Sequence, residues 1–183
     1  MTEGPFYPPL AYRARELDWD ADLTQVRRSA GGEPARAAGE WLDLFGTVVD
    51  ARGRAVDGAV IEVWQCDAFG AYRHPRGGGA KVDTAFQGFG SSRSDAEGRY
   101  RFRTIKPVPY PGRAPHIHVL ARHPSWGDWV SQLFVAGDPG NGRDFLYRSL
   151  AEGERAEAEM DWRRAPAGSR VTWLAERSLR VGA

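Results

Sequence analysis

Residues 59–65 read AVIEVWQ, a short apolar run rich in the β-branched and aromatic residues that favour strands. Because successive side chains of a strand point to opposite faces, Ile61 and Val63 are expected on one face and Trp64 on the other. Residues 50–53, DARG, supply a turn ahead of this run. A short apolar run that follows turn residues is typical of a strand in a β-sheet protein.

The same pattern recurs along the chain, punctuated by 22 glycines and 12 prolines. Strands are expected at 41–49, 59–65, 99–103, 116–121, 129–134 and 170–174, and a short helix within 144–160. Residues 66–93 form a long connection, and residues 106–115, with four prolines, form a stiff loop. We therefore predict an all-β fold with a β-sandwich core of six to eight short strands and long irregular loops.

The 183 residues suit one domain. We expect a single domain over residues 1–183, with an irregular N-terminal arm at 1–40 and the sandwich core at 41–175. Three aromatic residues, Phe6, Tyr7 and Tyr12, make the arm too apolar for a solvated tail, so it is expected to pack on other residues.

Composition narrows the classes of partner. The formal net charge is +1, so no basic excess points to nucleic acid. No apolar run reaches the roughly 18 residues of a membrane helix, and no secretory signal precedes the arm. The single cysteine, Cys66, cannot form a disulfide within the chain. These features predict a soluble, cytoplasmic protein without a nucleic-acid or membrane partner.

Two of the four histidines lie in the sequence His116-Ile117-His118. Residues i and i+2 of a strand face the same side, so both imidazoles should emerge together, with Ile117 turned to the opposite face. Two neutral imidazoles aimed at one point are the start of a metal site. Two exposed residues on a polar strand face would give the same motif, so the motif alone leaves both interpretations open.

Two tyrosines are candidates for further ligands. Tyr110 lies six residues before His116 on the proline-rich loop, and Tyr72 lies within the long connection. A phenolate held by a trivalent cation is a hard anionic oxygen donor, and it favours Fe(III) over Fe(II). On the residues alone, half-buried tyrosines with their hydroxyls in water are the simpler interpretation.

Ordered motifs from Thr2 to about Asp138 resemble the intradiol ring-cleavage dioxygenases, most closely the protocatechuate 3,4-dioxygenase type. The motifs are TEGPF at 2–6, EVWQ at 62–65, GAYRH at 70–74, FQGFG at 86–90, RTIKP at 103–107, PYP at 109–111, RAPHIH at 113–118 and QLF at 132–134. They cover most of the chain in the order in which that family carries them.

The resemblance implies a β-sandwich that holds a mononuclear non-haem Fe(III) ion. Carried over residue by residue, the expected equatorial ligands are Tyr72 and His116. The expected axial ligands are Tyr110 and His118.

The resemblance also implies that the ring of a catechol is cleaved with O2 to a cis,cis-muconate-type product, as in the catabolism of aromatic compounds. Tyr110 is expected to take a proton from the substrate. Arg113 is expected to lie against the substrate ring and to favour negative charge there, and Gln132 to lie beside it in the pocket. A biosynthetic role on another catechol stays open.

One feature departs from the family pattern. Only Pro111 and Gly112 separate Tyr110 from Arg113, whereas protocatechuate-type catalytic chains carry a longer loop with a tryptophan. A shorter, more open pocket wall is expected, which leaves the choice of catechol open. Because this chain keeps all four ligand positions, a single chain and a homo-oligomer are both open.

Two other functions fit parts of the sequence. Residues 46–61 also resemble the opening of transthyretin-like sandwiches, which are non-catalytic binding modules. A zinc hydrolase would need a carboxylate or thiolate near the histidines, and none is placed there in the sequence. The set of two tyrosines and two histidines with Arg113 favours the dioxygenase over both.

Overall fold

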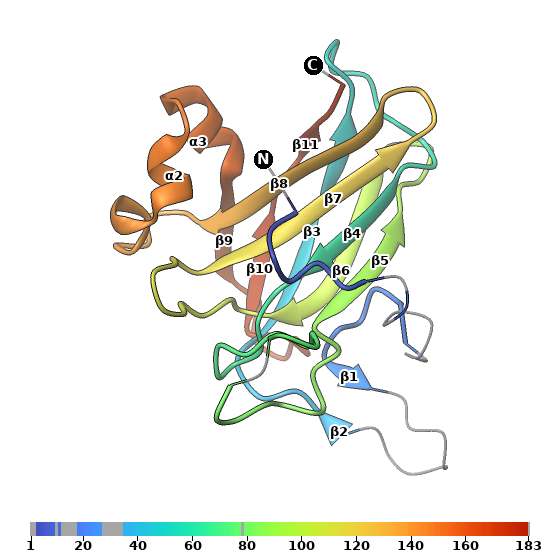
Figure 1. Ribbon diagram of the computed structural model, residues 1–183. Coiled ribbons are helices and arrows are strands. Elements are labelled where there is room, and N and C mark those ends of the chain that lie inside the picture. Colours follow the sequence, from blue (N-terminus) through green and yellow to red (C-terminus); the bar gives the residue numbers. More distant parts are fainter. Residues whose placement is uncertain (1–2, 10, 12–17, 27–34, 78, 183) are drawn as a thin grey trace.

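The computed structural model describes residues 3–9, 11, 18–26, 35–77 and 79–182, which fold mainly as strands (Figure 1). The strands in these residues are β1 (Gln25–Val26), β2 (Ala35–Arg36), β3 (Trp41–Val49), β4 (Val60–Trp64), β5 (Phe89–Arg93), β6 (Arg99–Ile105), β7 (His116–His123), β8 (Gly127–Val135), β9 (Glu159–Arg164), β10 (Trp173–Glu176) and β11 (Leu179–Arg180). Eight of the strands exceed two residues, which confirms the predicted β-sandwich of six to eight short strands.

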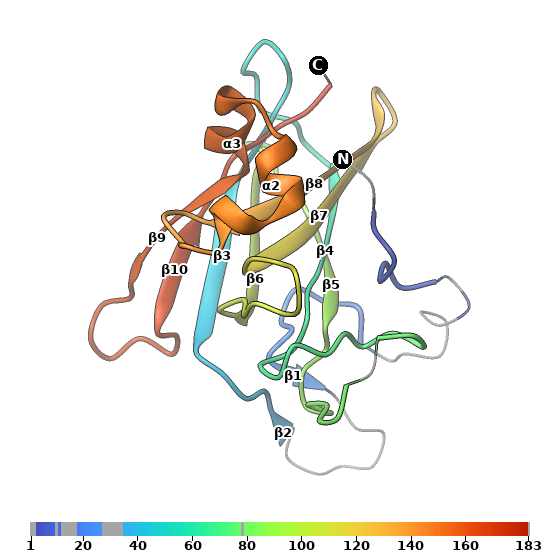
Figure 2. The same ribbon diagram turned by 60° about the vertical axis from the view of Figure 1, so that its left-hand side comes forward.

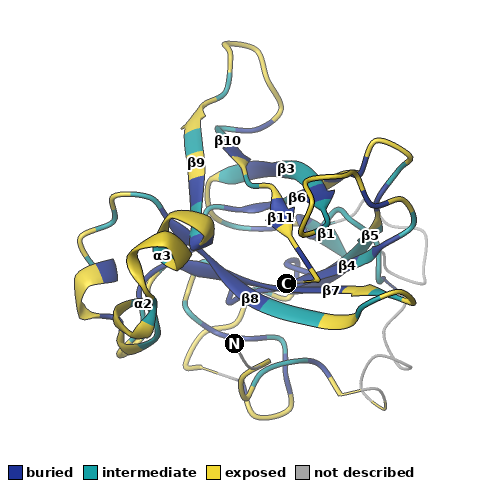
Figure 3. Ribbon diagram, turned by 90° about the horizontal axis from the view of Figure 1, so that it is seen from above, coloured by how far each residue is buried: buried dark blue, intermediate teal, exposed yellow. Residues whose placement is uncertain are grey.

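The strands form two layers, which Figure 3 shows from above. One layer has the order β5-β4-β7-β8, with antiparallel pairing throughout. The other places β3 between β6 and β10, with β9 next to β10. A short parallel pairing of β8 with β9 joins the two layers at one side. Strand β11 pairs with the far end of β3.

The main core lies between the layers and follows strand alternation. Ile61 and Val63 of β4 point into it, and so do Ile117 and Val119 of β7. Each of these side chains is at most 1% exposed. Full burial of such a side chain stabilises the fold by about 1.5–3 kcal/mol. The prediction that Ile61 and Val63 share a face opposite Trp64 is confirmed.

The opposite face of the β5-β4-β7-β8 layer is also buried. Trp64, Phe89 and Leu120 of this face pack with loop residues such as Tyr72. Figures 2 and 3 show the N-terminal segment and the loop that follows β4 on this outer side. A sheet face that would otherwise meet water is thereby covered by irregular chain.

The N-terminal arm packs on this face, as predicted from its aromatic residues. Phe6 stacks on Tyr72 with ring centroids 4.5 Å apart. Tyr7 lies edge-on to Trp64 at 4.8 Å, and its hydroxyl donates a hydrogen bond to the buried Glu62. Tyr12 lies outside the described residues.

Apart from the two-residue strands β1, β2 and β11, which are not predicted, the strand predictions differ from the structure mainly at three places. Strand β5 lies inside residues 66–93, which we expected to be a connection. Its Gly90 packs against the arm, because a Cβ there would lie 2.3 Å from the carbonyl oxygen of Asp20. Strand β9 is not predicted, since its charged residues hide the alternation. The last predicted strand, at 170–174, lies at Trp173–Glu176 instead.

The helices whose full extent lies within the described residues are found in one region. The short helix expected within 144–160 is present as two, α2 (Phe145–Ser149) and α3 (Glu152–Ala158), preceded by a 3-10 turn, η1 (Asn141–Arg143). Figure 1 shows both helices beside β9, at the edge where the layers join. In the described part of the chain, no helix has the length and apolar character needed to cross a membrane.

Close packing of β3 against the chain after β10 gives a test of the fold. A Cβ at Gly46 would lie 1.9 Å from the carbonyl oxygen of Arg177, so Gly46→Ala should lower the free energy of unfolding by about 3 kcal/mol. Gly153 in α3 has open space around its Cα, and Gly153→Ala should raise that free energy by up to about 1 kcal/mol. Urea denaturation measures both; equal effects of the two substitutions would contradict the packing.

Candidate metal centre

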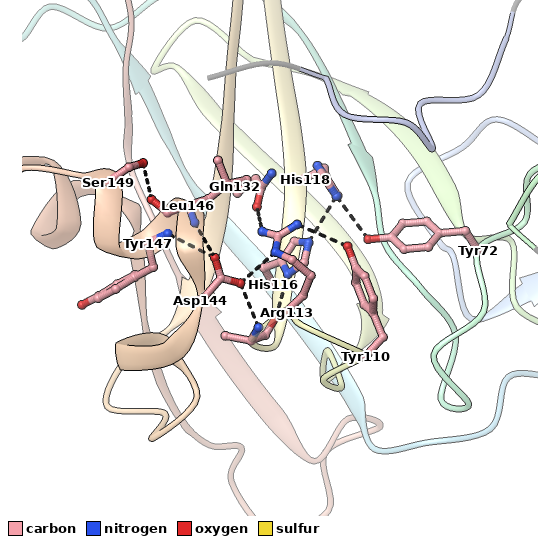
Figure 4. A network of polar contacts seen from close by, with 11 residues as sticks. Tyr72, Tyr110, Arg113, His116, His118, Gln132, Asp144, Leu146, Tyr147 and Ser149 are labelled. Carbon is pink, nitrogen blue, oxygen red and sulfur yellow. Dashed lines mark hydrogen bonds and ion pairs between the residues drawn. The ribbon is translucent and has the colours of Figure 1, made fainter.

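The site begins with the two histidines of β7, which lie on the outer face of their layer, opposite Ile117. Both are 2% exposed, and their Nε2 atoms lie 3.2 Å apart. The prediction that alternation brings both imidazoles to one side is confirmed. Figure 4 shows the two rings near each other, with Tyr72 and Tyr110 pointing toward them.

Tyr72 reaches the histidines from the loop after β4. Its hydroxyl lies 3.1 Å from His118 Nε2, and the residue is 4% exposed. The buried Asp67 shapes this loop, because its carboxylate accepts hydrogen bonds from the N–H groups of Phe69, Ala71 and Asp83. The side chain at 72 is therefore held by a loop with its own hydrogen-bond network.

Tyr110 comes from the proline-rich loop that precedes β7. A turn closes directly after it, since Arg113 N–H donates to the Tyr110 carbonyl at 2.9 Å. The ring of Tyr110 lies edge-on to the ring of Tyr72, with centroids 5.6 Å apart. Its centroid is 5.5 Å from that of the His116 ring. The structure therefore brings together all four residues that the sequence named as metal ligands.

Neighbouring groups fix the orientation of the rings. His116 Nδ1 lies 2.6 Å from the carbonyl oxygen of Ala114. A carbonyl only accepts, so Nδ1 carries the proton and the Nε2 lone pair is left for the site. Trp64 stacks on His118 with ring centroids 4.8 Å apart and an angle of 12°. The Nε2 atom of His116 thus faces that of His118, and the latter faces the Tyr72 hydroxyl.

Arg113 lies beside the ligand cluster and is held on several sides. Its Nη1 donates to the Tyr110 hydroxyl at 3.3 Å, and its Nη2 donates to Gln132 Oε1. Its Nε donates to Asp144 Oδ2 at 2.8 Å. The structure therefore places Arg113 and Gln132 together, as the sequence predicts, and it adds Asp144 to them.

Burial sets the protonation of the cluster. Desolvation, followed by the nearby Arg113 charge, lowers the pKa of His116 to about 4. Desolvation and the neighbouring His116 lower the pKa of His118 well below its ordinary value. Desolvation also raises the pKa of Tyr72 well above its ordinary value. At neutral pH the imidazoles are neutral, as metal ligands must be, and Tyr72 keeps its proton until a cation displaces it.

The hydrogen-bond pattern fits a cation at this position. His118 Nε2 lies within hydrogen-bond distance of both His116 Nε2 and the Tyr72 hydroxyl, but one neutral imidazole nitrogen cannot satisfy both. Metal–ligand bonds of about 2.1 Å at angles of about 90–110° would separate donor atoms by about 3.0–3.4 Å. The separations of 3.1 and 3.2 Å agree with that spacing.

The donor set also limits which metal chemistry fits. Among the described residues, no group of three or more His, Cys, Asp and Glu side chains could hold a metal ion. A cation at His116 and His118 must therefore draw on phenol oxygens, and phenolates suit a hard trivalent ion. This arrangement does not support the zinc-hydrolase alternative.

Two residues of the site are missed by the sequence analysis of function. Asp144 is the first residue of the segment 144–160 in which a helix is expected; an Asp at this place is typical of an N-cap but does not indicate an ion pair with Arg113. Trp64 was placed only on the face opposite Ile61 and Val63. Strand pairing of Trp64 with His118, which brings the two rings together, requires knowledge of the register.

Comparisons with known proteins give one consistent result. A family model described as "Dioxygenase" matches residues 3–165. The beta chain of protocatechuate 3,4-dioxygenase from Burkholderia cepacia is 38% identical over 163 residues, covering 81% of this chain and 66% of that protein. Hydroxyquinol 1,2-dioxygenase from Corynebacterium glutamicum is 36% identical over 154 residues, covering 74% of this chain and 45% of that protein.

The fold agrees with a solved structure over nearly its whole length. The dioxygenase domain of a dioxygenase carbohydrate-binding protein fusion from Streptomyces sp. SirexAA-E superposes with a TM-score of 0.69 at 25% identity. It covers 99% of this chain and 95% of that domain. The two curated relatives are longer, and this chain spans about two thirds of the first and about half of the second.

The lowered imidazole pKa predicts a pH dependence for the metal-free protein. As pH falls below about 6.5, an unfolded His116 takes up a proton, while the folded residue resists protonation until its pKa of about 4. Folding stability should therefore fall with pH, by about 2 kcal/mol from His116 alone between pH 7 and pH 5. Urea denaturation at the two pH values should show a smaller loss for His116→Gln. An equal loss in both proteins would rule out this source.

Proposed function

This chain belongs to the intradiol ring-cleavage dioxygenases, and from that premise we propose that it is an Fe(III)-dependent enzyme that cleaves a catechol ring with O2. The product would be a cis,cis-muconate-type diacid that carries both oxygen atoms. One observation supports this proposal most strongly: two neutral imidazoles and two phenols from three parts of the chain converge beside a buried guanidinium.

The proposed ligands of the iron are Tyr72, Tyr110, His116 and His118. When bound, Fe(III) would act as Lewis acid and template, and it would activate the catecholate toward O2. Deprotonated phenols stabilise the ferric state, because they are hard anionic donors. A transthyretin-like binding module has no use for such a buried and incompletely satisfied donor cluster.

Tyr110 is proposed to have a second role as a proton acceptor. A catechol must lose the protons of both hydroxyl groups to bind as a dianion, and the Tyr110 Oη can receive one of them. Arg113 Nη1 donates to this oxygen at 3.3 Å, so an oriented cationic donor lies beside the proposed proton acceptor. The guanidinium can keep its hydrogen bond to the Tyr110 oxygen before and after the proton arrives.

Arg113 is proposed to stabilise negative charge on the substrate ring as it reacts with O2. Its side chain is 10% exposed, so its charge acts in a site largely free of water. A guanidinium does not lose its proton at neutral pH, and it stays a fixed charge through the reaction. Gln132, 1% exposed, accepts from Nη2 and is proposed to hold that end of the group.

The substrate class follows from the short loop between Tyr110 and Arg113. A side chain at Gly112 would have no neighbour within 4 Å, so the loop has an open edge there. An open edge leaves room for substituents on the catechol ring. Since one chain supplies all four proposed ligands, the site needs none from a second chain, whether the protein acts alone or as a homo-oligomer.

The ligand assignment predicts colour together with activity. Protein loaded with Fe(III) should hold about one iron per chain and be red-brown through phenolate-to-iron charge transfer, and chelation should remove both colour and activity. Incubation with catechol and ¹⁸O2 should put two labelled atoms into the product. In Tyr72→Phe and Tyr110→Phe, the charge-transfer band should weaken and turnover should fall by at least about 100-fold. A colourless iron-replete protein would overturn the assignment.

The role of Arg113 predicts a change in turnover more than in binding. Arg113→Ala should lower kcat about 100-fold, with a smaller change in the affinity for catechol measured without O2. Arg113→Lys keeps a positive charge without the planar fork, and it should recover only part of the loss. Unchanged kcat in Arg113→Ala, with full iron content, would exclude this role.

A further inference from the structure

Asp144 is a fully buried carboxylate that joins helix α2 to the site. Its side chain is 0% exposed, and it occupies the N-cap position directly before Phe145. Oδ1 accepts hydrogen bonds from the N–H groups of Leu146 and Tyr147, at 2.9 and 3.1 Å. Oδ2 accepts from Arg113 Nε and from Ala114 N–H, at 2.8 and 2.9 Å. Each oxygen therefore serves a different part of the structure (Figure 4).

The oxygen that faces Arg113 determines how the guanidinium points. Arg113 donates through Nη1 to the Tyr110 hydroxyl and through Nη2 to the amide oxygen of Gln132. Asp144 is the one anion with which Arg113 forms an ion pair among the described residues. The bond at Nε is the one that joins the cation to an anion, and the helix cap holds this anion in place. The Asp144 carboxylate thus fixes the plane of the Arg113 guanidinium.

The same carboxylate also holds the chain next to the ligand strand. Ala114 N–H donates to Asp144 Oδ2, and the Ala114 carbonyl accepts from His116 Nδ1. One residue therefore lies between the carboxylate and the imidazole. Arg113 and Ala114 are thus both held by a single buried group, which is not itself one of the proposed ligands.

We propose that Asp144 is a positioning residue for ring cleavage, which aims the Arg113 guanidinium and ties its direction to helix α2. This inference rests on the proposed function of the site. It assigns Asp144 no contact with substrate or metal and no proton transfer. Its effect on turnover should pass through Arg113.

The two functions of Asp144 can be separated by substitution. A serine is a good N-cap, so Asp144→Ser can still accept from the first N–H groups of α2, but its hydroxyl is too short to reach Arg113 as well. Tyr147→Phe does the reverse. It removes the hydrogen bond from Tyr147 to Glu159 that anchors α2, at 2.7 Å, and it leaves the contact between Asp144 and Arg113 in place.

Asp144→Ser should lower kcat at least about tenfold, because a guanidinium displaced by even 1 Å no longer stabilises the reacting ring. Iron content, the charge-transfer band and the anaerobic affinity for catechol should stay within about threefold of the parent protein. Tyr147→Phe should keep kcat within about twofold. An effect of Tyr147→Phe as large as that of Asp144→Ser would show a general role of α2 and overturn the proposal.

A double-mutant cycle tests whether the effect passes through Arg113. In the Arg113→Ala background, Asp144→Ser should lower kcat less than about twofold further, since the group it positions is gone. A second factor of ten would mean that Asp144 acts elsewhere and would overturn the proposal.

The parent protein, Asp144→Ser, Arg113→Ala and the double variant can also be unfolded in urea without iron. This measurement does not depend on activity. The double variant should lose less free energy of unfolding than the two single variants lose together, because neither ion of the pair is left buried alone. If this coupling is present but no protein cleaves catechol, the proposed function fails while the structural pairing stands. If catechol is cleaved and Asp144→Ser leaves kcat unchanged, the positioning role fails alone.

Discussion

The two-residue period of β4 and β7 is the constraint on which the rest of the structure depends. On one face, Ile61 and Ile117 build the core between the two layers. On the other face, the same strands present Trp64, His116 and His118, and pairing of Trp64 with His118 brings those rings into stacking contact. A one-residue slip of β7 would move both imidazoles into the apolar core. The register that forms the core therefore also forms the site.

Putting the site on an outer sheet face creates a second requirement, which the irregular segments meet. Such a face normally meets water, where imidazoles would titrate near their ordinary pKa and a phenol would be solvated. Here the arm stacks Phe6 on Tyr72, and the long loop is closed around Asp67. This cover excludes solvent, and the resulting desolvation lowers the pKa of both histidines. Long loops in this fold thus control the chemistry of the site as well as connecting strands.

How far the sequence predicts this structure depends on the range of the interaction. Strand alternation is local, so the core face of β4 and the pairing of His116 with His118 on one side follow from it directly. The positions of Tyr72 and Tyr110 were predicted through family motifs, because no local rule brings a loop 38 residues away onto Tyr110. Strand β5 is not predicted, because its small residues are explained by the arm that packs against it. The arm and β5 are distant in the sequence. Asp144 was missed as a partner of Arg113 for the same reason.

The metal centre also has an energetic cost that a cation would offset. Three polar atoms lie close together with too few protons to pair all of their lone pairs: His118 Nε2, His116 Nε2 and the Tyr72 hydroxyl oxygen. A buried polar group that is left without a partner costs about 1–3 kcal/mol. Apolar residues in their place would give a more stable sheet face. A fold that keeps them buried, and surrounds them with oriented partners, is arranged for a cation that binds all of the lone pairs at once. Because that binding would stabilise only the folded chain, loading with iron would offset the free energy that the unsatisfied lone pairs cost.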